Sequence, residues 1–360
     1  MVGVNTLKSF DLVISRDNTG HIVPMDLVVK IILEHSFDTY AITGYMLFLD
    51  SVGYGGSLPL DNQCSLILSM VDMRENSYNE HFSITKVDEY LEGKTKMVKV
   101  EFISLDVVDM FIEHKSRAFE DKTHSEIVSS IFNDFGVSVP TIDMDTKHEL
   151  VVTPQNQNTF ITVNKLIKDS GIYVYKRGDE YFCVDKTSIV GEEIDEVYAQ
   201  VNDLYPNNIK YLDIDTYDST ENIITYPDTN YMKFDPLKKV VELVEVKNDD
   251  LLLGLNDKKI EYGEVKSIRT LPMSYWKNDK ENLHFRNNIN NIKVDLLSSG
   301  SFSVGLGNIV DVEIPEQIVP SNNGMLSGKY LVYGTKYIIS ADGLFDQELN
   351  LRRDDFQERR

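Results

Sequence analysis

The spacing of apolar and polar residues predicts that the chain begins with β-strands. Short runs rich in apolar and β-branched residues, such as YAITGYMLFLDS and DNQCSLILSMVDM, are separated by a glycine-containing turn segment. A longer run, HFSITKVDEYLEGKTKMVKVEFIS, has Glu92 and Gly93 at its centre, which is typical of a hairpin. These patterns predict an antiparallel β domain over residues 1–105.

A helical period replaces the strand pattern at Thr123. Thr123 and Glu126 have the spacing of a capping box, in which the threonine hydroxyl accepts the Glu126 backbone N–H and the glutamate carboxylate accepts the Thr123 backbone N–H. The apolar residues that follow fall on one helical face, and Gly136 can end the helix in a left-handed conformation. We therefore expect a helix over about 123–135.

A second helical pattern covers about 159–169, where apolar residues again recur on one face and Gly171 lies near the end. The next segment, IYVYKRGDEYFCVD, consists of two short aromatic-rich runs with a central turn, which predicts a hairpin over 172–185. Together these elements predict a small α+β domain at residues 106–195.

Strand patterns return after residue 196 and dominate the rest of the chain. In GNIVDVEIP the apolar side chains alternate with Asp311 and Glu313, which is the pattern of a strand with one solvent-facing side. The closing segment, KYLVYGTKYIISADGLFDQELNLR, predicts two more strands joined by a tight turn at Asp342 and Gly343. A meander of at least three strands is therefore expected here.

These strands define a second β region over residues 196–240 and 276–355. Residues 241–275 include a polar, loop-like stretch and are predicted to form a small inserted region. Residues 356–360 have no apolar period and are predicted to be a charged tail.

Charge and hydropathy limit the classes of function. Lysine and arginine number 36 against 58 aspartates and glutamates, a formal net charge of -22, so the field of the protein repels phosphate backbones. Ordinary nucleic-acid recognition is therefore not expected, although the charge can also serve solubility alone. No stretch is apolar for long enough to span a bilayer, and we expect no membrane insertion.

No motif in the sequence predicts catalysis, a metal centre or a cofactor site. The seven histidines are scattered, and Cys64 and Cys183 have no metal-binding spacing. The run DIDTYD places Asp213, Asp215 and Asp218 close together but lacks the glycine and bidentate glutamate of an EF-hand loop, so an exposed strand is favoured over a calcium site. Because acidic residues are abundant, a carboxylate pair for glycoside hydrolysis stays open.

The order of these elements resembles that of the baseplate hub proteins of contractile-tailed bacteriophages, a family related to the base of type VI secretion spike proteins and to phage late control proteins. The resemblance spans about residues 40–353. It is carried by the closing segment 307–353 and by four others, DSVGYGGSLPLDNQCSLILSM, SRAFEDKTHSEIVSSIFNDFGV, FITVNKLIKDSGIYVYKRGDEYFCVD and YMKFDPLKKVVELVEV.

This resemblance implies an α+β, mainly β fold. In it, two similar antiparallel β-barrel-like torus domains, residues 1–105 and residues 196–240 plus 276–355, accompany the small α+β domain and the inserted region. It further implies a homotrimeric, non-enzymatic adaptor without cofactors, which joins the sixfold tail tube to the threefold spike and forms part of the DNA channel.

The resemblance also implies partners and a location. The expected partners are the central spike protein, a tail tube or tube-initiator protein, and baseplate wedge or other hub proteins, while DNA passes through without specific binding. The protein is expected in the tail baseplate of the virion after assembly in the host cytoplasm.

Seven residues are assigned roles on these grounds. Asp311 and Glu313 are candidates for acidic residues that face the channel, and the expected structural residues are Thr123, Glu126, Gly136, Asp342 and Gly343. Two alternative functions are a tail-associated peptidoglycan hydrolase that uses an acidic pair and a receptor-binding tail protein that stacks host glycans on some of the 19 tyrosines.

Overall fold

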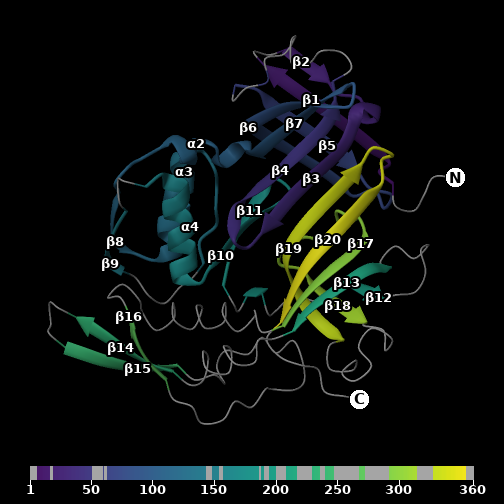
Figure 1. Ribbon diagram of the computed structural model, residues 1–360. Helices are drawn as coiled ribbons and strands as arrows, with labels where there is room; N and C mark the ends of the chain where they lie inside the picture. Colours follow the sequence, from purple (N-terminus) through teal and green to yellow (C-terminus); the bar gives the residue numbers. More distant parts are fainter. Residues whose placement is uncertain are drawn as a thin grey trace.

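A computed structural model shows a predominantly β molecule with a few helices, which confirms the mainly β, α+β class (Figure 1). Most of the predicted inserted region and the whole predicted tail lie outside the part of the chain that the structure describes. The described residues are 6–16, 19–50, 60, 63–142, 148–153, 157–185, 188–189, 194–199, 208–216, 229–235, 240–246, 267–271, 292–313 and 327–353.

One 13-stranded sheet dominates the described residues, in the order β13-β17-β20-β19-β3-β4-β7-β6-β5-β1-β2, with β18 paired to β19 and β12 to β18. Its N-terminal strands, here called the N-terminal β region, are β1 (Ser9–Arg16), β2 (Thr19–Ile22), β3 (Val28–Ser36), β4 (Thr39–Leu49), β5 (Ser65–Val71), β6 (Ser77–Glu92) and β7 (Thr95–Ser104). The remaining strands, the C-terminal β region, are β12 (Ile194–Ala199), β13 (Ile209–Thr216), β17 (Ile292–Ser299), β18 (Ile309–Glu313), β19 (Gly328–Ser340) and β20 (Phe345–Arg353).

Strand β19 connects the two β regions. Its first residues pair with β18, its middle pairs with β20, and its last seven residues, from Gly334 onward, pair antiparallel with β3. The residues just before β1 lie against the turn of the β19–β20 hairpin. Thr6 forms a β-bridge with Leu344, and the Leu7 backbone N–H donates to the Gly343 carbonyl at 3.0 Å. Followed from strand to hydrogen-bonded strand, the N-terminal β region therefore begins at β19 and comes back to the β19–β20 hairpin at its turn (Figure 1).

The apolar cores follow the same division and share the same hairpin. Near its turn, the β19–β20 hairpin contributes to the core of the N-terminal β region through Tyr337, Ile339 and Phe345. At its open end it contributes to the core of the C-terminal β region through Tyr330, Val332, Leu349 and Leu351. One hairpin thus belongs to two cores.

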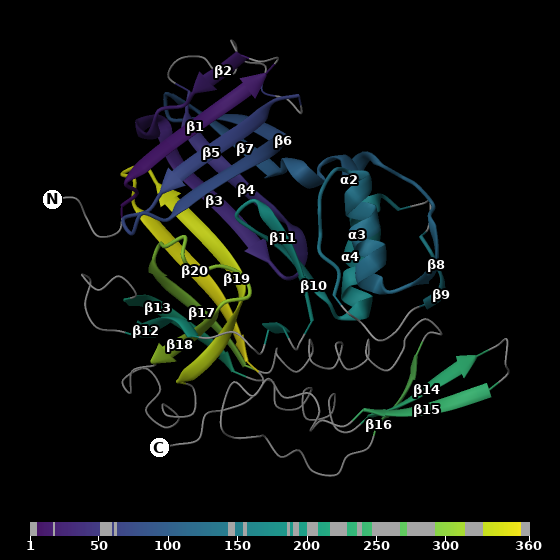
Figure 2. The same ribbon diagram turned by 180° about the vertical axis from the view of Figure 1, so that it is seen from behind.

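The α+β unit lies beside the sheet (Figures 1 and 2), and its core also includes Tyr40 and Ala41 of β4 and Ile103 of β7. Its elements are the short helices η2 (Leu105–Val107) and α2 (Asp109–Ile112), the helices α3 (His124–Asp134) and α4 (Thr159–Ser170), the pair β8 (Ala118–Lys122) and β9 (His148–Val152), and the hairpin of β10 (Tyr173–Arg177) and β11 (Glu180–Val184). None of the described helices combines the length and the apolar character needed to cross a membrane.

Local hydrogen bonds fix the ends of both long helices. At the start of α3, the Thr123 backbone N–H donates to Glu126 Oε2 at 2.8 Å, and the Glu126 backbone N–H donates to Thr123 Oγ1 at 3.2 Å. Gly136 follows α3 with a φ of 77°. Asn158 caps α4 by accepting the Ile161 backbone N–H, and Gly171 ends that helix in the left-handed region.

A separate three-stranded sheet contains β14 (Thr229–Asp235), β15 (Val240–Val246) and β16 (Ser267–Leu271). It lies apart from the main sheet in both views (Figure 2). The sequence division placed β14 in the second β region, whereas its described partners are β15 and β16. The domain limits themselves stay a prediction.

We expect Gly44→Ala to destabilise the protein. A Cβ at Gly44, in β4, would lie 2.3 Å from the Ile32 carbonyl oxygen and 2.8 Å from the Phe102 ring, so the central strands would have to move apart. Overpacking of this kind costs about 1–3 kcal/mol of unfolding free energy. Gly305→Ala is the matched control because a Cβ there meets no atom within 4 Å. Urea denaturation measures both variants, and equal stabilities would contradict the close approach.

Candidate functional site

Three parts of the molecule meet at one place, which we call the junction. They are the N-terminal β region, the β10–β11 hairpin, and the loop between β17 and β18 (residues 300–308). Phe37, which follows β3, has its ring 4.6 Å from that of Tyr173 and 5.2 Å from that of Tyr175, both on β10. The Phe37 ring is also 5.4 Å from that of Tyr333 on β19. Buried aromatic contacts of Phe37 therefore join the N-terminal β region to the β10–β11 hairpin and to β19.

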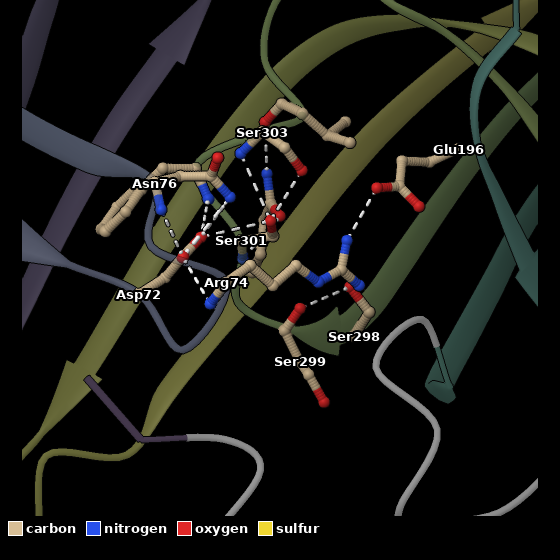
Figure 3. Close-up of polar contacts among 11 residues, drawn as sticks. Asp72, Arg74, Asn76, Glu196, Ser298, Ser299, Ser301 and Ser303 are labelled. Atoms are coloured by element: carbon tan, nitrogen blue, oxygen red, sulfur yellow. Dashed lines mark hydrogen bonds and ion pairs between the residues drawn. The ribbon is translucent and has the colours of Figure 1, made fainter. Parts of the chain in front are cut away.

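Asp72 is the main polar contact between the two β regions (Figure 3). It follows β5, is almost fully buried, and its carboxylate accepts the backbone N–H groups of Arg74 at 2.8 Å and Asn76 at 2.9 Å in its own turn. The same carboxylate accepts the Phe302 backbone N–H at 2.9 Å from the loop between β17 and β18. Ser301 Oγ lies 3.4 Å from it. One carboxylate thus orders a turn and holds a loop more than 200 residues away in sequence.

Further contacts surround this carboxylate. The Phe302 ring stacks on Tyr78 of β6 at 5.3 Å and lies 4.5 Å from Phe345 of β20. On the other side, Arg74 forms an ion pair with Glu196 of β12 at 2.7 Å, which Figure 3 also shows. The loop is therefore held by polar contacts and by the aromatic core.

A charged cluster connects the N-terminal β region to the β10–β11 hairpin. The Lys176 ammonium on β10 lies 2.8 Å from Glu80 on β6 and 2.5 Å from Asp106 in η2. The side chains of Lys176 and Glu80 are only 6% and 3% exposed, whereas that of Asp106 is 33% exposed. Each buried charge therefore depends on its partner, because an isolated buried charge is strongly destabilising.

The pKa values at the cluster follow from burial and from these partners. Burial acts to lower the pKa of Lys176, but the two carboxylates outweigh it and the pKa is raised, so the ammonium stays charged. Burial raises the pKa of Glu80, and the ammonium, which Asp106 also uses, only partly offsets this. Glu80 is thus the member of the cluster that protonates more easily than an ordinary glutamate.

The next residue of β10 fixes the loop itself. Arg177 donates through Nη2 to the Leu306 carbonyl at 2.6 Å. Gly307 has a φ of 83°, and a Cβ there would lie 2.7 Å from the Tyr175 hydroxyl, so this turn requires glycine. Asn308 then donates to Asp195, the residue that precedes Glu196 on β12, at 2.6 Å.

These contacts surround a cavity of about 100 Å³ at the junction, here called the junction cavity. Its lining comes from β3, β6, β10, β19 and the loop between β17 and β18. The charged side chains in the lining are Glu80, Lys176 and Arg177, and His35 and Tyr78 also line it. The cavity wall thus combines these polar groups with apolar side chains such as Leu33, Ile42 and Phe302.

The residues singled out in the sequence lie elsewhere. Asp311 and Glu313 are on β18, where Asp311 is half-buried and in register with Lys329 while Glu313 is exposed. Thr123 and Glu126 cap α3, and Gly136 follows that helix. Asp342 and Gly343 form the β19–β20 turn, with Gly343 at a φ of 71°. The structure does not bring these groups of residues together.

Two of the candidate reactive groups, Cys183 and part of the DIDTYD run, can be placed in the structure. Burial raises the pKa of the Cys183 thiol to about 12, so it stays protonated at neutral pH. No group of three histidines, cysteines or carboxylates that could hold a metal occurs among the described residues. In the DIDTYD run, Asp213 is exposed on β13, and Asp218 lies outside the described residues.

Sequence reasoning did not identify the junction residues. Asp72 and Glu80 occur in predicted strands or turns, where a single carboxylate carries no motif. Lys176 adjoins the turn of the hairpin predicted over 172–185, and its partners Glu80 and Asp106 are 96 and 70 residues away in the sequence. The only local signal is Asp72 with Asn76, which is a typical turn pair.

We expect Asp72→Ala to lower the free energy of unfolding by about 2–4 kcal/mol. The substitution leaves the buried backbone N–H groups of Asn76 and Phe302 without their acceptor. The control is Asp88→Ala, because Asp88 is half-exposed and its ion-pair partner Lys86 is also exposed, an interaction of little weight. If urea denaturation shows equal midpoints for the two variants, Asp72 does not hold the loop.

We also expect Lys176→Met to lower the free energy of unfolding by about 3–5 kcal/mol, since it leaves the Glu80 carboxylate buried without its cation. Adding Glu80→Gln removes that charge, so the double variant should recover a measurable part of the lost stability. Lys86→Met, at an exposed pair, should leave the midpoint almost unchanged. Failure of the double variant to recover stability would argue against a buried charge as the cause.

Comparison with known proteins gives a clear result only for structures. No family model matches the sequence, and no curated protein does. The tail protein from Neisseria meningitidis MC58 has a TM-score of 0.63 and 9% identity, with 96% of this chain and 97% of that chain covered. The 43 kDa tail protein of prophage MuSo2 from Shewanella oneidensis has a TM-score of 0.64 and 11% identity, with coverage of 96% and 99%.

A type VI secretion protein shows a similar likeness. The E. coli c3393 protein, a component of the type VI secretion system with structural similarity to the T4 tail proteins gp27 and gp5, has a TM-score of 0.55 and 10% identity, with 92% of this chain and 74% of that chain covered. At these identities the similarity concerns the fold. The chain therefore has the fold shared by these phage tail and type VI secretion proteins, which confirms the resemblance indicated by the order of its sequence elements.

Proposed function

We propose that this protein is a non-enzymatic hub of a contractile phage tail baseplate. The observation that carries the proposal is the β19–β20 hairpin, which belongs to the cores of both β regions and thereby joins them as one body. Near-complete mutual coverage with two phage tail proteins supports the same role for the whole described fold.

In the proposed assembly, three chains form a ring. Because each chain holds two β regions in a fixed relation, three chains present six β regions to a sixfold tail tube while keeping threefold symmetry for the spike. Asp72, the Arg74–Glu196 pair and the Lys176 cluster fix the angle between the parts, as an adaptor requires. Closed rings also cover strand edges that would otherwise pair with other chains.

The proposed channel follows from the charge of the protein. A net charge of -22 lets DNA slide through a lumen without specific binding. Glu313 is exposed on β18 and Asp311 is half-buried on the same strand, and we assign both to the channel side. Spike, tube and wedge proteins are the proposed partners, in the virion after assembly in the host cytoplasm.

We expect the purified chain to give a mass three times that of one chain by light scattering, or, with its tube and spike proteins, to enter a complex whose mass corresponds to three copies of the chain plus the bound partners. Negative-stain images should then show a ring with threefold symmetry. A chain that stays monomeric with both partner proteins present would overturn the proposal. Lysis of cell walls by the isolated chain would favour the hydrolase alternative, and binding to host cells that blocks infection would favour the receptor-binding alternative.

A further inference from the structure

The buried ammonium of Lys176 is shared by two carboxylates that come from two different elements. It lies 2.8 Å from Glu80 on β6 and 2.5 Å from Asp106 in η2. Lys176 and Glu80 are almost fully buried, so water does little to screen their charges. Two negative charges therefore face one positive charge, and these three residues together carry one unbalanced negative charge at neutral pH.

The nearest residue of like charge to Lys176 along β10 is directed to other partners. Arg177 donates through Nη2 to the Leu306 carbonyl at 2.6 Å, and its guanidinium carbon lies 5.9 Å from the centres of two aromatic rings of the same hairpin. On β6, the His81 backbone N–H donates to the Glu80 carboxylate at 3.1 Å. The ammonium of Lys176 is thus the cationic group that contacts Glu80.

Four other titratable side chains lie near these charges and stay neutral. Burial raises the pKa of each of Tyr78, Tyr181 and Tyr337, and burial lowers the pKa of His35 to about 3. The ring centre of Tyr181 is 5.8 Å from the ammonium of Lys176, and the other three line the same cavity. At mildly acidic and neutral pH these groups add no charge, so the imbalance stays with the carboxylates.

A proton on Glu80 removes this imbalance, because it leaves the Lys176 ammonium with Asp106 alone. A protonated carboxyl keeps an oxygen that accepts hydrogen bonds, so the contact with the ammonium persists. Burial and the charge of Asp106 act to raise the pKa of Glu80, and Lys176 offsets them only in part. As the pH falls, Glu80 should therefore protonate before ordinary glutamates do.

We propose that Glu80, Lys176 and Asp106 form a proton-dependent lock, in which one proton taken up by Glu80 on acidification strengthens the attachment of the β10–β11 hairpin to the N-terminal β region. When the hairpin moves away, Glu80 meets water and titrates as an ordinary glutamate. The attached state binds the proton more tightly, so by linkage the proton favours that state. The lock belongs to the isolated chain and does not depend on the proposed trimer.

The sign of the pH dependence follows from the raised pKa of Glu80. Its stabilisation is fully present below the ordinary glutamate pKa of 4.5 and is lost as the pH rises through the raised value. His35 acts in the opposite direction, because its pKa falls from 6.5 to about 3 and the unfolded chain then binds a proton that the folded chain does not. Comparison of variants at each pH separates the two residues.

Urea denaturation of the native chain and of Glu80→Gln between about pH 5 and pH 8 tests the proposal. The amide has nearly the size of the carboxyl and carries no charge at any of these pH values. We expect Glu80→Gln to gain stability relative to the native chain as the pH rises, because only the native chain acquires the unbalanced charge. Glu92→Gln, the same change at an exposed residue of the same strand, should follow the native chain. Parallel curves for the native chain and Glu80→Gln would overturn the proposal.

Nuclear magnetic resonance of the side-chain carboxyl carbons measures the pKa of Glu80 in the native chain, with Glu80→Gln identifying its signal. The value should lie above the ordinary 4.5. Asp106→Asn removes the second carboxylate and should move the titration of Glu80 to lower pH, since Lys176 then balances Glu80 alone. An ordinary value in the native chain, or no movement in Asp106→Asn, would contradict a shared ammonium.

Hydrogen exchange reports on the attachment of the hairpin itself. The protection of β10 amides, corrected for the intrinsic rate at each pH, is compared between the native chain and Glu80→Gln. The ratio of the two should rise about threefold or more between about pH 7 and about pH 5. An unchanged ratio would mean that the proton does not act on the hairpin, and the lock would then be wrong.

Discussion

The β19–β20 hairpin is the constraint on which the rest of the structure depends. Its turn-proximal side chains fill one core and its open end fills another, and β19 continues the ladder into β3. Apolar burial is the dominant stabilising term in folding, so a hairpin shared by two cores couples their stabilities. Neither β region can rotate about the other without opening a core or breaking that ladder.

The contacts at the junction restrict how the coupled parts are oriented relative to one another. The aromatic contacts of Phe37 prefer certain ring orientations, whereas Asp72, Arg74 and Lys176 also require particular polar partners at short distances. Buried ion pairs contribute little net stability compared with apolar residues of the same volume, but removal of one partner is costly. The cluster thus selects one arrangement of the three parts more than it strengthens the fold.

The features that could be predicted from the sequence are those that depend on residues close together in the chain. Thr123 and Glu126 are three residues apart, so the cap of α3 is visible in the sequence, and alternation of apolar residues was enough to indicate a mainly β chain. The order of the predicted helices and strands then indicated the fold that the chain shares with phage tail and type VI secretion proteins. The junction could not be predicted because Asp72 meets Phe302 across 230 residues and Lys176 meets Glu80 across 96. A lone carboxylate or lysine in a strand has no periodic signal.

Contacts between the first strands and the β19–β20 hairpin, such as that between Thr6 and Leu344, have a consequence for folding during synthesis. During synthesis the strands β1 to β7 emerge first, but β3 has no β19 to pair with until residues 334–340 have been translated. Tyr337, Ile339 and Phe345 are also absent from the first core until then. Pairings of this sequence separation form slowly. A chain in which β19 has not yet been made therefore exposes the open edge of β3, which can pair with strands of other chains.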